Sequence, residues 1–186
     1  MATATDTIDT FIGLNRSWLS SMAVEESART GYTHKVTVSA KDIAARASAN
    51  SIDGSSDELM MAVMTLAQNE DSDSAVTDAA LIVTKPFTSA TATTVVCDVG
   101  DAAGGAQILA AVTLITTGTG AERGHASYAT LPEDENPLLD VNGGTQGTAA
   151  GTIYMNFLNS AAGGLDDLTD GEVTLLLKVR ESSVIA

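Results

Sequence analysis

Two consecutive runs of aliphatic and β-branched residues constrain the fold of this chain more than any other feature. Residues 79–85 (AALIVTK) and residues 94–99 (TVVCDV) are separated by a connection rich in Pro, Ser and Thr. In the second run Val95, Cys97 and Val99 alternate with more polar positions, the period of a β-strand with one buried face. The first run is apolar on both faces, which is typical of a strand in the middle of a sheet or under an interface. We therefore predict two long neighbouring strands.

The same reasoning predicts further strands along the chain. They are expected to start at Tyr32 and to cover residues 58–67, 112–117, 152–159 and 172–180. In the last two strands the alternation predicts which side chains point inward, namely Ile153, Met155 and Phe157, with Tyr154 and Asn156 outward, and Val173, Leu175, Leu177 and Val179. Residues 58–67 are apolar on both faces and are also compatible with a helix, but their short length between loops favours a strand. A capping box, Ser39 to Asp42, predicts a short helix over residues 42–49. Residues 118–142 are expected to be irregular apart from a brief edge strand at Leu138, Leu139 and Val141.

This pattern of seven to nine strands, without βα alternation or internal repeats, predicts an all-β fold. We expect an antiparallel two-sheet sandwich of jelly-roll type, with an N-terminal arm or helix. Residues 1–31 form the predicted arm and residues 32–186 the predicted sandwich domain. The apolar residues of the first segment are spaced nearly as one helical stripe. Either this segment docks as a helix on its own domain, or it orders on a neighbouring subunit.

The charge of the chain bears on its partners. The 186 residues contain 9 basic and 24 acidic side chains, a formal net charge of −15. Residues 1–60 carry five basic and eight acidic groups, so most of the negative charge lies in residues 61–186. Long-range repulsion then disfavours nucleic acid and anionic membranes as partners. The N-terminus lacks a basic segment followed by an apolar core, so we expect no signal peptide and synthesis in the cytoplasm.

No pattern of reaction chemistry is evident. The single Cys97 lies on the predicted inward face of a strand and is expected to be a small buried apolar residue. His34 and His125 have no neighbours at metal-ligand spacing. The acidic turn at residues 69–74 has Ser74 and Ala80 where a calcium loop requires Gly and Glu, and the turn at residues 166–171 has Leu168 and Leu177 in ligand positions. We therefore expect no enzyme activity, no catalytic residues, no cofactor and no metal.

From residue 58 onward the order of features resembles the capsid decoration, or cement, proteins of tailed bacteriophages. The matching segments are LMMAVMTL, ALIVTKPF, TTVVCDVGD with its Asp-x-Gly turn, a polar loop region and the terminal strand DGEVTLLLKV. The resemblance implies a β-sandwich on the outer surface of the virion capsid. It further implies a homotrimer that bridges neighbouring subunits of the major capsid protein.

We expect the partner contacts to come from the arm and from apolar residues on outward strand faces. Met60, Ala62 and Met64 would give their strand a second apolar face, and Val96 and Leu176 interrupt the polar faces of other strands. The predicted contact residues with the capsid or between subunits are Phe11, Leu14, Arg16, Trp18, Met22, Arg29, Met60, Met64 and Leu176. Two alternatives remain: another virion part, such as a head fibre base or tail component, and a carbohydrate-binding, adhesin-like β-sandwich.

Overall fold

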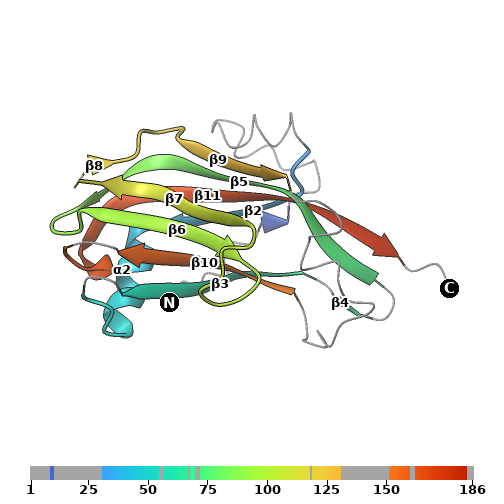
Figure 1. Ribbon diagram of the computed structural model, residues 1–186, viewed down its shortest axis with the longest axis horizontal. Coiled ribbons are helices and arrows are strands. Elements are labelled where there is room, and N and C mark those ends of the chain that lie inside the picture. Colours follow the sequence, from blue (N-terminus) through green and yellow to red (C-terminus); the bar gives the residue numbers. More distant parts are fainter. Residues whose placement is uncertain are drawn as a thin grey trace.

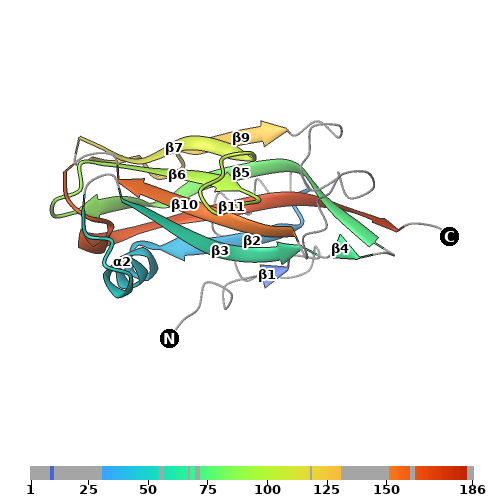
Figure 2. The same cartoon turned by 60° about the horizontal axis from the view of Figure 1, so that its bottom comes forward.

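Two antiparallel sheets pack face to face in the computed structural model (Figures 1 and 2). The structure describes residues 9–10, 31–54, 57–66, 68–69, 72–117, 119–130, 151–159 and 162–183. Sheet A contains β1 (Asp9–Thr10), β2 (His34–Ser39), β4 (Gln68–Asn69), β5 (Ser72–Ser89), β9 (Ala126–Thr130) and β11 (Leu168–Ser183). Sheet B contains β3 (Glu58–Leu66), β6 (Thr94–Gly100), β7 (Leu109–Thr116), β8 (Thr119–Gly120) and β10 (Gly151–Asn159). The expected all-β, antiparallel two-sheet sandwich is confirmed.

The longer strands pair in a regular scheme. Leaving aside the two-residue strands β1, β4 and β8, the first strand pairs with the last, β2 with β11. The second pairs with the next to last, β3 with β10, and the same rule gives β5 with β9 and β6 with β7. The main path of sheet A is β2-β11-β5-β9 and that of sheet B is β3-β10-β6-β7.

This scheme corrects one prediction about the two aliphatic runs. They form β5 and β6, which are consecutive in the chain but lie in different sheets. The connection at residues 90–93 therefore crosses from one layer to the other. Of the two positions predicted for the first run, in the middle of a sheet or under an interface, the structure shows the first. β5 lies between β11 and β9, and residues 79–83 are all buried.

The inward faces of both sheets supply the main core. In β11 Val173, Leu175 and Leu177 point inward, and in β10 Ile153, Met155 and Phe157 do so; all six are fully buried. Both alternations match the prediction. The core is filled by aliphatic side chains and Met, with Phe87 and Phe157 as the large aromatic pieces.

Met64 is an exception to the expected alternation in β3. The register between β10 and β3 shifts between Ile153 and Tyr154, so Ile153 pairs with Met64 and Tyr154 pairs with Ala62. Such a bulge adds one residue to a strand and reverses the faces of the residues that follow. Met64 is therefore buried in the main core, and the prediction that it lies on the outward face is wrong.

A short helix closes one end of the sandwich. α2 (Ala40–Ala49) begins at Ser39, whose hydroxyl accepts a hydrogen bond from the Asp42 N–H while the Asp42 carboxylate accepts from the Ser39 N–H. These reciprocal bonds are the predicted capping box. Ile43 and Ala47 face the main core, and α2 packs against β11 and the 3-10 turn η3 (Leu165–Asp167) (Figure 1).

One of the longer strands, β9, was not foreseen from the sequence. Residues 126–130 (ASYAT), expected to be irregular, form β9 and pair with residues 78–82 of β5. The segment has few large apolar side chains, so its sequence lacks the usual strand signal. Its backbone pairing with β5, rather than side-chain pattern, accounts for the strand.

Candidate functional site

The predicted contact residues fall in different places. Phe11, Leu14, Arg16, Trp18, Met22 and Arg29 lie outside the described residues, as does the brief edge strand expected at residues 138–141. Met60 is on the outward face of β3 and is 49% exposed. Met64 lies in the main core, and Leu176 is on the outward face of β11 but fully buried. The structure therefore does not bring Met60, Met64 and Leu176 together on one surface.

Leu176 belongs to a second, small hydrophobic cluster on the outer side of sheet A. Its members are Tyr32, Ala80, Ile82 and Leu176, with Ala126 packed against them. The prediction that Leu176 points away from the main core is confirmed, but its side chain is covered within the chain. Tyr128 of β9, paired with Ala80, is the large apolar residue that remains exposed near this cluster, at 56%.

The outward side of sheet B carries a more accessible apolar surface. We call it the outer face of sheet B and define it by Met60, Ala62, Val96, Tyr154 and Leu158. The register places Tyr154 beside Ala62 and Leu158 beside Val96. Met60 and Ala62 are exposed and the other three are partly exposed. Directly paired side chains in a sheet lie close enough to contact. The two pairs are separated along β10 by Asn156, and Met60, which pairs with Asn156, lies between them on β3.

A buried amide anchors a loop across this face. Asn156 pairs with both Met60 and Asp98 and also points outward, yet it is fully buried. Its Oδ1 accepts a hydrogen bond from the Gly104 N–H at 3.1 Å, and its Nδ2 donates to the Gly105 carbonyl at 2.7 Å. Figure 1 shows the β6–β7 connection passing over β10 and β3. The loop of residues 101–107 thus covers Asn156 and lies next to Met60.

The glycines in this loop are required by its close approach to the sheet. Gly104 has a φ of +74°, a conformation that L side chains rarely adopt. A Cβ on Gly100 would lie 2.6 Å from the Gly105 backbone. The sequence showed a glycine-rich loop here, but no signal in it indicated that Asn156 would hold the loop.

A second polar contact shapes the same region. The Asp98 carboxylate accepts a hydrogen bond from the Ala111 N–H, where the register between β6 and β7 shifts and Ala111 has a φ of +51°. The side chain therefore satisfies a backbone donor that the irregular ladder leaves unpaired. Asp98 fixes the bulge beside the loop that Asn156 holds.

The two sheets differ in charge. Among the described residues, each Lys or Arg that lies in a strand lies in sheet A, namely Lys35, Lys85, Lys178 and Arg180. In the strands of sheet B, as described, the charged residues are Glu58 and Asp98, and both are acidic. In sheet A, Lys85 pairs with Asp170 at 2.6 Å and Lys178 with Asp78 at 3.4 Å. The first pair, together with the Gly171 N–H, lowers the pKa of Asp170 below its ordinary value.

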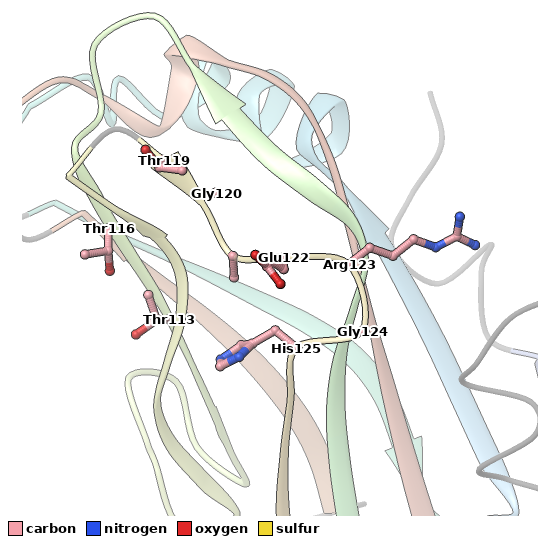
Figure 3. Close-up of a pocket in the computed structure, with 9 residues that line it drawn as sticks. Thr113, Thr116, Thr119, Gly120, Glu122, Arg123, Gly124 and His125 are labelled. Atoms are coloured by element: carbon pink, nitrogen blue, oxygen red, sulfur yellow. The ribbon is translucent and has the colours of Figure 1, made fainter.

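The pocket shown in Figure 3 lies where the chain crosses from sheet B to sheet A. It is open, with a volume of about 620 Å³, and is lined by Thr113, Thr116 and residues 119–125. The crossing segment is tied to both sheets, since the Ala121 N–H donates to Leu114 and the Gly124 N–H donates to Val83. This segment fixes the backbone of the pocket.

The side chains of the pocket offer polar binding groups rather than a catalytic arrangement. Glu122 and His125 border the hollow together with the threonines, while Arg123 points away from it (Figure 3). No side-chain hydrogen bond or ion pair joins these described residues to one another. A nucleophile activated by a general base would need such a contact.

The thiol of Cys97 lies away from the pocket, in the core. Cys97 is fully buried, and burial, with a smaller effect of Asp98, raises the pKa of its thiol well above the ordinary value. The thiolate is the nucleophilic form, so Cys97 is inert, and the prediction that it is a buried apolar residue is confirmed. Within the described part of the chain, no three His, Cys, Asp or Glu residues are grouped to hold a metal. No helix there is long and apolar enough to cross a membrane.

Replacing Asn156 with Ala is expected to loosen the loop of residues 101–107. The substitution leaves the Gly104 N–H and the Gly105 carbonyl without their partner, at a cost of about 1–3 kcal/mol in the free energy of unfolding. Urea unfolding measures that cost, and amide hydrogen exchange at Gly104 measures the loosening, which should be faster.

The matched control for this prediction is Asn159→Ala. Asn159 is also fully buried, but its amide donates to the Gly163 carbonyl at the other end of β10. This variant should lose stability without changing exchange at Gly104. Equal exchange at Gly104 in the wild type and the Asn156 variant would show that the amide does not hold the loop.

Comparison of the chain with protein-family models, with curated proteins and with solved structures gave no match.

Proposed function

We propose that this chain is a virion structural protein, a non-catalytic decoration protein on the outer surface of a tailed-bacteriophage head. In this role it binds neighbouring subunits of the major capsid protein and stabilises the shell by bridging them. It is synthesised in the host cytoplasm and added to the capsid as a homotrimer, the state that the sequence resemblance implies.

The observation that carries the proposal is the pairing of strands in the sandwich. Successive pairs join the first strand to the last, the second to the next to last, and so on through β6 and β7. This order is that of a long antiparallel hairpin rolled into two sheets, and it supports assignment of the fold as a jelly roll. Jelly rolls recur in viral capsid proteins and in lectins. The strand order and the resemblance therefore favour the same class of protein, independently of one another.

The carbohydrate-binding alternative also fits a jelly roll, and the open pocket at Thr113 and His125 gives it a location. Proteins commonly bind sugars on exposed aromatic rings, because the apolar face of a sugar packs against the face of the ring. None of the residues that line the pocket is Phe, Tyr or Trp. The lining therefore favours the structural role, and a glycan array tests the alternative.

The negative charge is consistent with a position on the outside of a particle. A net charge of −15 disfavours contact with the packaged genome, because phosphate groups repel an acidic protein. It also disfavours association between decorated particles at low salt. That residues 1–31 contribute to binding the shell remains a prediction.

We expect the purified chain to sediment with empty shells of the major capsid protein encoded by the same genome. Bridging of subunits should also raise the temperature at which these shells fall apart, because a ligand that binds only the assembled form stabilises it. An unrelated acidic protein of similar size serves as the control for trapping in the pellet. If the chain stays in the supernatant at micromolar concentrations, the proposed function is wrong.

A further inference from the structure

We infer that the outer face of sheet B, rather than sheet A, is the surface that contacts the capsid shell. We further infer that the complementary surface on the shell is an apolar patch bordered by Arg or Lys. This inference rests on the proposed function and adds the binding face and the chemistry of the partner.

The first argument comes from the apolar residues that each sheet exposes. Among the described residues, the large apolar side chains classed as exposed are Met60 on sheet B and Tyr128 on sheet A. Around Tyr128 the other apolar residues of the outward side, Ile82 and Leu176, are already buried. Around Met60 they remain partly or fully exposed, as defined above for the outer face of sheet B. Among the described residues, sheet B therefore leaves more outward apolar side chains for a partner to cover than sheet A does, on both sides of the loop that Asn156 holds.

The second argument comes from charge. Glu58 pairs with Leu158 and Asp98 with Asn156, so both carboxylates lie on the outer face of sheet B, and Asp101 begins the loop beside it. The strands of this sheet, as the structure describes them, contain no Lys or Arg. A partner surface with carboxylates at its rim would be repelled, whereas one with basic residues there would be attracted. Sheet A carries both signs, including the pairs Lys85–Asp170 and Lys178–Asp78. Because sheet A carries both signs of charge, its charges do not favour a basic partner surface over an acidic one.

The third argument is the rigidity of the face. Asn156 holds the loop of residues 101–107 against β10, and Asp98 holds the bulge at Ala111. A Cβ on Gly104 would lie 3.7 Å from the Glu58 carboxylate and 3.9 Å from the Met60 sulfur, so the loop packs beside both residues without covering Met60. A surface that is already ordered loses little conformational entropy on binding. Met60 itself is flexible enough to fit an irregular partner surface.

The test compares two substitutions of similar exposure on opposite sheets, Met60→Lys and Tyr128→Lys. Binding to empty shells of the major capsid protein is measured by sedimentation over a range of concentrations. Met60→Lys places a cation against a basic rim and removes a central apolar contact, so we expect binding at least about tenfold weaker. Tyr128→Lys makes the same change of charge on the other sheet and should bind within about twofold of the wild type. Circular dichroism and thermal melting check that both variants fold.

Each outcome decides the inference. Wild-type binding together with full binding by Met60→Lys overturns the assignment of the face and leaves the proposed function standing. Weaker binding by Tyr128→Lys than by Met60→Lys would place the contact on sheet A and would also overturn the inference. Loss of binding by Met60→Lys accompanied by loss of the homo-oligomer in analytical ultracentrifugation would assign the face to self-association instead. Failure of the wild type to bind shells refutes the proposed function, and this inference with it.

Discussion

Replacing Leu175 with Asp is expected to leave the chain unfolded at room temperature. Leu175 is fully buried in the middle of β11 and pairs with Val36 on one side and Leu81 on the other, both of which are also fully buried. Leu175 belongs to the main core cluster, whose members are hydrophobic side chains. The variant loses a buried leucine, worth about 2–5 kcal/mol, and must also desolvate a carboxyl group at a cost of several kcal/mol. The sum approaches the whole stability of a typical domain, about 5–15 kcal/mol.

Far-UV circular dichroism and the dispersion of the NMR spectrum measure this outcome. Leu175→Met is the matched control, because it keeps the volume and the apolar character and should cost less than about 1.5 kcal/mol. An Asp variant that melts like the wild type would remove β11 from the core and contradict the register described above.

The free energy of unfolding is expected to rise with salt concentration. The net charge of −15 sets many surface carboxylates against one another. Raising NaCl from roughly 0.05 M to about 2 M shortens the range of this repulsion from more than about 10 Å to less than about 3 Å. Each exposed pair of like charges destabilises the fold by a few tenths of a kcal/mol. Screening these pairs should therefore raise the free energy of unfolding by on the order of 2 kcal/mol.

Urea unfolding at each salt concentration gives the measurement, because urea adds no charge. The ion pairs Lys85–Asp170 and Lys178–Asp78 act in the opposite direction, since salt weakens them. A stability that is flat or falls as salt increases would show that these local attractions outweigh the general repulsion. A rise would confirm that the acidic surface destabilises the isolated chain at low salt.

The sequence predicted the buried face of a strand correctly where apolar and polar residues alternate along the whole strand. The alternation in β10 and β11 predicted the inward residues of both strands, and Ser39 with Asp42 predicted the start of α2. In each case the structure is determined by neighbours within a few residues in the chain. Burial of Cys97 followed from the same alternation.

The failures have a common physical origin, because they depend on contacts between residues distant in the chain. The inward turn of Met64 results from a bulge against β10, which the sequence of β3 alone does not reveal. β9 exists because β5 offers it a backbone edge. The separation of β5 and β6 into two sheets depends on where β11 and β10 pair.

The candidate site was only partly foreseeable for the same reason. Met60 and Val96 were identified as outward apolar residues, and both belong to the outer face of sheet B. Asn156 was expected to point outward, but its burial beneath the loop of residues 101–107 required knowledge of a hydrogen bond spanning about fifty residues of chain. Leu176 was expected at a surface, and its burial reflects the second cluster with Tyr32 and Ile82.

Electron cryomicroscopy of empty capsid shells, imaged alone and after saturation with this chain, tests the proposed function most directly. The account predicts added density on the outer surface, at regular positions between major capsid subunits, into which the two-sheet sandwich fits with the outer face of sheet B toward the shell. Shells that look the same with and without the chain, or density confined to the portal and tail, would contradict it.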